Sequence, residues 1–77
     1  LLNYYTTEEK IIAVVSNILD VKSIDLQSTQ ENTSEWDSLA YLSVVCAIEE
    51  AFAIEISQEN INNFTSIQKI LNEINNS

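Results

Sequence analysis

The 77-residue sequence contains no glycine, no proline and no histidine, and its single cysteine is Cys46. Without glycine or proline, the chain lacks the usual residues of the tight turns that join short strands, so an all-α fold is expected. The commonest general base is missing, and one cysteine without histidine forms no zinc or iron–sulfur ligand set. We therefore expect neither catalytic residues nor a metal site.

The lone cysteine also excludes a disulfide within the chain, which is typical of a reducing compartment, and we expect a cytoplasmic protein. No apolar run in the sequence approaches the ~20 residues that a membrane-spanning helix requires. We expect no membrane segment.

Basic residues are scarce, since Lys10, Lys22 and Lys69 stand against twelve acidic residues and the formal net charge is −9. An acidic surface of this kind repels nucleic acid and anionic membranes, and it attracts basic protein partners. Solubility of a small domain would explain the same acidity. The charge therefore indicates a class of partner without identifying one.

The first third of the chain combines one helical segment with a long polar stretch. Thr6 and Glu9 have the spacing of a capping box, so we expect a helix from near Thr6 to around Asp20. Residues 21–36 show no sustained period and predict a long surface connection, an unusual feature that is often functional. The apolar stripe of the first helix is Ile11, Ile12, Val15, Ile18 and Leu19.

A second helix is expected from Asp37 or Ser38, because Asp37 is a good N-cap. Trp36 and Tyr41 have the spacing of a hydrophobic staple around this start. A helix so apolar either lies centrally in the core or reserves one face for a partner. Its apolar residues are Leu39, Leu42, Val44, Val45, Cys46, Ile48 and Phe52.

Two further helices complete the prediction. Ser57 is expected to cap a short helix over residues 58–63. Thr65 and Gln68 have capping-box spacing for a last helix, with left-handed asparagines expected at residues 75–76. The sequence therefore predicts an all-α four-helix bundle, with three longer helices, a short third helix and a long loop between helices one and two. Residues 1–77 form a single domain in this prediction, and the complete last helix favours a free-standing protein.

Ser38 is expected in the first turn of the second helix. Backbone N–H groups and the positive end of the helix dipole would favour a phosphate ester there by about 0.3–1 kcal/mol. Taken alone, however, Asp37 and Ser38 are also ordinary residues for the start of a helix.

The stretch Asp37-Ser38-Leu39, followed by AYLSVVCAIEEAFAIEIS, closely resembles the signature of the acyl carrier protein family. In that family, Asp-Ser-Leu opens the second helix, and an apolar run then leads to a Glu-Glu-x-Phe segment and an Ile-x-Ile-like segment. The resemblance extends from about Thr6 to Ile74. The residues that match these later segments are Glu49, Glu50, Phe52, Ile54 and Ile56.

The resemblance implies a non-catalytic, monomeric carrier. A phosphopantetheinyl transferase, using coenzyme A and magnesium, would join 4'-phosphopantetheine to the Ser38 hydroxyl, and Asp37 would help the transferase to position it. The thiol of this arm would then hold an acyl group as a thioester, so the chemistry belongs to the cofactor.

The resemblance also implies that acyl-loading and acyl-transfer enzymes recognise the second helix. Leu39 and Cys46 would make apolar contacts, and Glu49 and Glu50 would pair with basic patches on those enzymes. No contact with nucleic acid or membrane is implied.

Carriers of bacterial fatty-acid synthesis typically have acidic residues two and five positions after the serine, whereas this chain has Ala40 and Ser43. We therefore favour a specialised bacterial pathway, such as a secondary-metabolite or surface-polysaccharide cluster. Two alternatives stay open: an aminoacyl or peptidyl carrier of the same fold, and an unmodified acidic helical adaptor.

Overall fold

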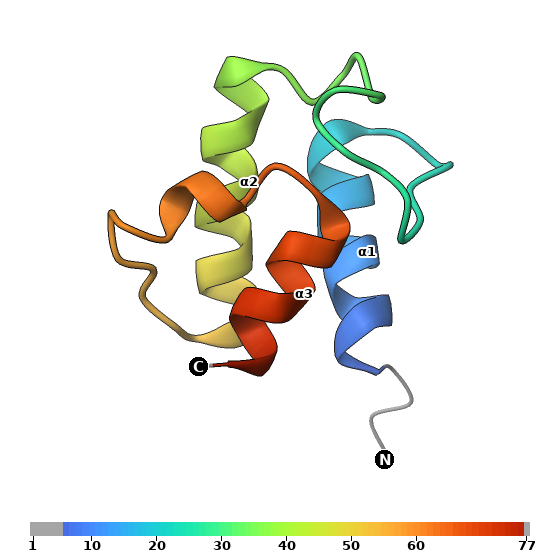
Figure 1. Ribbon diagram of the computed structural model, residues 1–77. Helices are drawn as coiled ribbons and strands as arrows, with labels where there is room; N and C mark the ends of the chain where they lie inside the picture. Colours follow the sequence, from blue (N-terminus) through green and yellow to red (C-terminus); the bar gives the residue numbers. More distant parts are fainter. Residues whose placement is uncertain (1–5, 77) are drawn as a thin grey trace.

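The computed structural model describes residues 6–76 and is helical, as predicted. Three α-helices and one short 3-10 turn follow one another along the chain, with a long loop between the first two helices (Figure 1). The elements are α1 (Thr7–Leu19), α2 (Ser38–Phe52), η1 (Ile61–Asn63) and α3 (Ile67–Asn75). No helix within residues 6–76 has the length and apolar character to cross a membrane.

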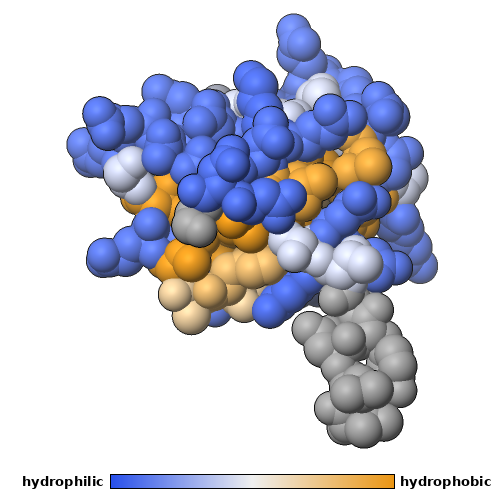
Figure 2. Space-filling model, turned by 60° about the horizontal axis from the view of Figure 1, so that its bottom comes forward, coloured by the Kyte–Doolittle hydropathy of each residue, from blue (hydrophilic) through white to orange (hydrophobic). Residues whose placement is uncertain are grey.

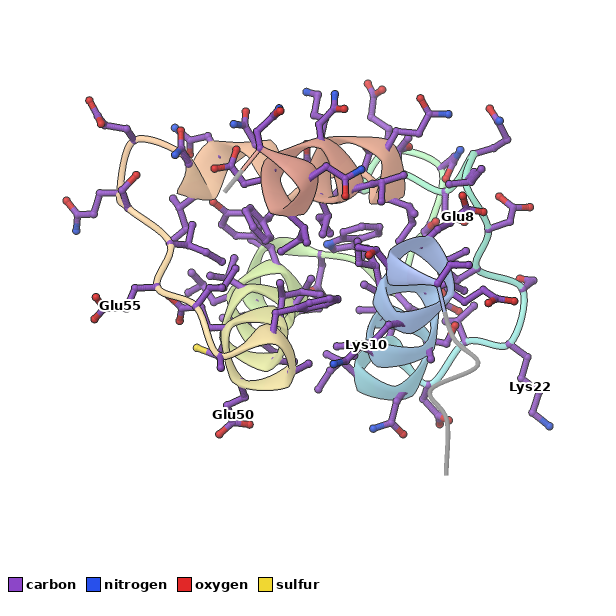
Figure 3. All side chains as sticks on the ribbon, turned by 90° about the horizontal axis from the view of Figure 1, so that it is seen from below. Glu8, Lys10, Lys22, Glu50 and Glu55 are labelled. Atoms are coloured by element: carbon purple, nitrogen blue, oxygen red, sulfur yellow. The ribbon has the colours of Figure 1, made fainter. Side chains whose placement is uncertain are left out.

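The helices form two layers. α1 and α2 lie side by side and run in opposite directions, while α3 and η1 lie across one side of this pair (Figures 1 and 3). The core between the layers takes side chains from every helix and from the long loop. Its members are Ile11, Val15, Leu19, Ile24, Trp36, Val44, Val45, Ile48, Phe64, Ile67 and Ile70.

α1 begins where its sequence predicts. The Thr6 Oγ1 atom accepts a hydrogen bond from the Glu9 N–H at 3.1 Å, and the Glu9 Oε1 atom accepts one from the Thr6 N–H at 3.0 Å. This reciprocal pair satisfies two donors that a helix start leaves without partners. The predicted capping box is therefore confirmed.

One of the three lysines joins α1 to the far end of α2. The Lys10 Nζ atom lies 4.7 Å from the centroid of the Phe52 ring. Figure 3 shows Lys10 between the two helices, pointing from α1 toward α2. A cation over an aromatic face contributes about 0.5–1 kcal/mol at a site open to solvent. This contact therefore helps to hold the two antiparallel helices in register.

Left-handed residues end both long helices, although the chain has no glycine to use there. Asp20 has φ 57° after α1, and Ala53 has φ 55° after α2. The end of α1 at Asp20 is as predicted, and a left-handed aspartate is tolerated because its side chain is short and polar. Asn76 has φ −99°, so the prediction of left-handed asparagines at residues 75–76 is wrong for the residue that ends α3.

The predicted short helix over residues 58–63 is also wrong in extent. Only Ile61–Asn63 is helical, as a 3-10 turn, and Asn60 before it makes no side-chain cap. The carbonyl of Ser57 accepts the N–H groups of both Asn60 and Ile61, at 3.0 and 3.1 Å. These bonds form a turn, and a segment this short does not repay the cost of nucleating an α-helix.

The predicted capping box of α3 starts one residue too early. Ser66 is the N-cap, and its side chain accepts the Lys69 N–H at 3.1 Å, in place of the expected pair Thr65 and Gln68. The long loop explains the shift, because the Thr65 carbonyl accepts the Gln30 N–H at 2.7 Å. Thr65 is therefore held beside the loop.

This contact fixes the middle of the long loop near the start of α3. Thr29 and Ser66 form an antiparallel bridge, and the Ser28 carbonyl accepts the Ile67 N–H at 3.1 Å. Two apolar residues of the loop, Ile24 and Trp36, are buried in the core. The loop therefore lies on the surface, as its sequence predicts, and is held to the core at a few points.

The surface around these elements is mostly polar. Figure 2 turns the lower end of Figure 1 forward and shows polar residues over much of that face, with a band of apolar residues across it. α2 and α3 both end there in Figure 1, and Phe52 and Ile74 near their ends are only partly buried. The small core therefore leaves some of its outer side chains in contact with solvent, as expected for a domain of this size.

Candidate functional site

The start of α2 is built by Asp37. Its backbone is extended, and its Oδ1 atom accepts the N–H groups of Leu39 at 3.1 Å and Ala40 at 2.8 Å. The Asp37 carbonyl also accepts the Tyr41 N–H at 2.9 Å. Aspartate is among the best N-caps because its carboxylate satisfies donors that the first turn leaves free. The predicted start of the second helix is therefore confirmed.

Ser38 is the first residue of α2 and is exposed to solvent. Within residues 6–76, its hydroxyl makes no hydrogen bond that would hold it against the protein. The neighbouring Asp37 carboxylate is occupied by the backbone of the first turn. This arrangement presents the Ser38 hydroxyl to solvent.

An open hollow of about 340 Å³ lies beside Ser38. Its walls come from the long loop, the first turns of α2, and the segment around η1. The lining residues are Gln30, Ser38, Tyr41, Leu42, Asn62 and Thr65. An exposed hydroxyl beside an open hollow fits the covalent attachment of a flexible group such as phosphopantetheine, because nothing nearby blocks the hydroxyl.

The predicted partner-binding residues separate into two kinds. Leu39 is 80% exposed, and Cys46 and Glu50 are also exposed. Their spacing places them on one face of α2, since seven and eleven residues are close to whole numbers of helical turns. Figure 3 shows Glu50 pointing away from the bundle. These three residues therefore lie on one solvent-facing stripe.

Glu49 differs from its neighbour. It is half-buried, and its Oε2 atom accepts the Ile56 N–H at 2.9 Å. Its backbone carbonyl also accepts the N–H groups of Ala53 and Ile54 beyond the end of α2. Glu49 thus holds the connection that follows α2, and its carboxylate is not free on the stripe with Glu50.

A second hollow, of about 360 Å³, lies between α1 and α2. Leu42 is 52% exposed and Ile18 is 39% exposed. The sequence assigns Ile18 to the apolar stripe of the first helix and gives no signal that it is accessible. The lining residues are Ile18, Leu42, Ser43, Cys46, Ala47 and Glu50. We call this hollow together with Leu39 the α2 surface.

Gln30, Asn62 and Thr65 beside Ser38 are also absent from the predicted site. They are far apart in the sequence, and single polar residues in loops carry no pattern that would select them. Within residues 6–76, no group of acidic or cysteine side chains is placed to hold a metal ion.

Comparison with known proteins gives a consistent set of matches. The family model described as "Phosphopantetheine attachment site" matches residues 9–74, which include Ser38. The acyl carrier protein of Buchnera aphidicola is 35% identical over 71 residues, with 90% of each chain covered. A mitochondrial protein of Schizosaccharomyces pombe, named as an acyl carrier protein, is 40% identical over 63 residues. That match covers 78% of this chain but only 56% of the yeast protein.

Proposed function

Because the chain belongs to the acyl carrier protein family, whose members are non-catalytic carriers with a phosphopantetheine attachment site, we propose that Ser38 is the residue that bears the arm. The observation that carries this proposal is the position of Ser38. It is an exposed serine at the first residue of α2, with a free hydroxyl beside an open hollow. The acyl intermediates that such a carrier holds would then be linked to this hydroxyl.

In this proposal the cofactor supplies the thiol to which cargo is bound, and the residues of the chain present it. Asp37 keeps the first turn of α2 formed and leaves the Ser38 hydroxyl facing solvent. A phosphopantetheinyl transferase recognises this turn and provides the base and the magnesium ion. The positive end of the α2 dipole lies near the phosphate that becomes attached to Ser38.

We further propose that partner enzymes bind the α2 surface. Leu39, Leu42 and Cys46 supply exposed apolar contacts, and Glu50 supplies a charge for a basic residue of the partner. The net charge of −9 favours the approach of basic enzymes from a distance. Glu49 contributes mainly through the shape of the connection after α2, because its carboxylate is already bonded to Ile56.

The residues at two positions of α2 favour dedicated partners in a specialised pathway. Ala40 and Ser43 carry no charge, and Ser43 lines the hollow of the α2 surface. A partner that relies on several acidic contacts would lose two of them here. Enzymes that read apolar side chains and the single charge of Glu50 suit this surface better. The cytoplasmic location stays a prediction, because one of the relatives named above is a mitochondrial protein.

The attachment is tested by measuring the intact mass before and after incubation with coenzyme A, magnesium and a broad-specificity phosphopantetheinyl transferase. The wild type should gain the mass of one phosphopantetheine, and S38A should gain none. S57A is a matched control, because Ser57 is another exposed serine but lies outside α2 and outside the α2 surface. Modification of S38A, or its loss in S57A, would contradict the assignment.

A further inference from the structure

The pair formed by α1 and α2 is covered by helices on one side only. α3 and η1 lie across one side of the pair, and Glu50 of α2 points away on the opposite side (Figure 3). Among residues 6–76, no helix lies across that opposite side. The hollow of about 360 Å³ in the α2 surface is lined by residues of α1 and α2, and none of these residues comes from α3. A molecule bound in this hollow would therefore contact α1 as well as α2.

Ile18 is the residue of α1 that lines the hollow. It belongs neither to the core nor to the partly buried apolar side chains that pack against the core, and the same is true of Leu42. Isoleucine also has a lower helix propensity than lysine or glutamine, so the helix does not require it at this position. One exposed apolar side chain is ordinary, but several that share one hollow indicate a surface for another molecule.

The charge of the hollow indicates what kind of molecule this is. Glu50 is the one charged residue among those that line it. Within residues 6–76, the Glu50 carboxylate makes no hydrogen bond or ion pair, so it is free to pair with a lysine or arginine. A second copy of this chain would bring its own net charge of −9, and its Lys10 already lies over the Phe52 ring. The charge therefore favours a basic partner over self-association.

The apolar and acidic parts of the hollow are separated along α2. Leu42 and Glu50 are eight residues apart in this helix, which places their backbones about 12 Å apart along its axis. A partner helix lying along the pair covers this distance in just over two turns. An apolar residue and a basic residue about seven positions apart share one face of such a helix, and a long basic side chain spans the remaining distance.

The hollow also adjoins the proposed attachment site. Leu42 lines both this hollow and the one beside Ser38. A helix bound between α1 and α2 would therefore lie next to the first turns of α2. The enzyme to which it belongs would be held beside the residue that bears the arm.

We propose that the hollow between α1 and α2 binds a basic amphipathic helix of a partner enzyme, with an apolar side chain against Ile18 and Leu42 and a lysine or arginine at Glu50. Ile18 is then a specificity-determining residue, because a polar side chain at this position would leave the apolar side chain of the partner without its contact on α1. The enzymatic role of this contact rests on the proposed attachment at Ser38, whereas the binding itself does not require the arm.

The binding is tested with synthetic helical peptides and the unmodified protein. One basic peptide carries a leucine and an arginine about seven positions apart on one face, and a control peptide of the same composition carries them on opposite faces. Methyl resonances of Ile18 and Leu42 are followed during the titration, with Leu71 of α3 as the reference. We expect the first peptide to shift the Ile18 and Leu42 signals and to leave Leu71 unchanged. The control peptide should bind about tenfold more weakly.

Substitutions assign the contact to particular residues. I18N should weaken binding of the first peptide about tenfold, whereas I18L should bind it as the wild type does. A13N places the same asparagine at another exposed position of α1, outside the hollow, and should also bind as the wild type does. E50Q should bind more weakly at low salt and should lose most of the salt dependence, because salt screens the attraction between exposed charges. Circular dichroism of I18N checks that its helices are retained.

Equal binding of the first peptide by the wild type and I18N, or equal binding of the two peptides, would overturn the proposal. Sedimentation of the free protein as a dimer that I18N dissociates would also overturn it, because a second copy would then occupy the hollow. The gain of mass at Ser38 is measured separately. Its absence would contradict the attachment and the enzymatic role, whereas a modified protein that does not bind the first peptide would contradict the docking alone.

Discussion

Replacing Glu49 by alanine is expected to destabilise the protein, whereas the same change at Glu50 is expected to have little effect. The two acids are adjacent in α2, but the Glu49 carboxylate accepts the Ile56 N–H at 2.9 Å and Glu50 points into solvent. Surface residues without such partners usually change the free energy of unfolding by less than about 0.5 kcal/mol. Comparing the stabilities of E49A and E50A therefore distinguishes an acidic residue that supports the fold from one that only lies on the surface.

The size of the effect follows from two opposing contributions. A hydrogen bond to a charged group is worth about 1.5–3 kcal/mol, and a half-buried position lies toward the lower value. Glu49 also lies in the last turn of α2, where the helix dipole disfavours a negative charge by about 0.3–1 kcal/mol, and alanine removes that cost. The net loss of stability for E49A is therefore about 0.5–1.5 kcal/mol.

Urea unfolding followed by circular dichroism measures this loss. With a denaturant slope of about 1 kcal/mol per molar urea for so small a domain, the midpoint of E49A should fall by about 0.5–1.5 M. E49Q should lose less, because the amide oxygen can still accept the Ile56 N–H. Equal midpoints for E49A and E50A would refute the structural role of the Glu49 carboxylate.

Two further predictions concern α3 and the α2 surface. S66A should lower the free energy of unfolding by about 1 kcal/mol because it removes the N-cap of α3, whereas T65A should lower it clearly less. Thermal unfolding of the two variants measures this difference. A larger loss of stability in T65A than in S66A would show that Thr65 is the cap. L42A should reduce kcat/KM of a partner enzyme by about tenfold, since about 1.4 kcal/mol of apolar contact is lost. The unfolding midpoint of L42A serves as the control for its fold. An unchanged kcat/KM would contradict the proposal that partner enzymes contact Leu42.

The starts of the two long helices could be predicted because their signals are local. Thr6 and Glu9 are three residues apart, and the Asp37 carboxylate bonds to N–H groups two and three residues away. Such contacts form in any chain with this spacing once the helix forms. The resemblance carried by Asp37-Ser38-Leu39 likewise depends on neighbouring residues.

The misplaced cap of α3, and two features of the site that the sequence does not reveal, lie where separate segments meet. Thr65 has the spacing of a cap, but its carbonyl is held by Gln30 of the long loop, and the cap moves to Ser66. The bond from Ile56 to Glu49 crosses the end of α2, so the sequence alone ranks Glu49 with Glu50. The hollow beside Ser38 depends on three such segments together, which explains why its amide lining could not be predicted.

The central claim is that Ser38 bears the arm, and the most direct measurement is the location of the modification on protein purified from its own cells. Cleavage after glutamate yields the fragment of residues 36–49, which contains two serines, Ser38 and Ser43. Tandem mass spectrometry of this fragment should place a single phosphopantetheine on Ser38. An unmodified fragment, or one modified at Ser43, would contradict the account.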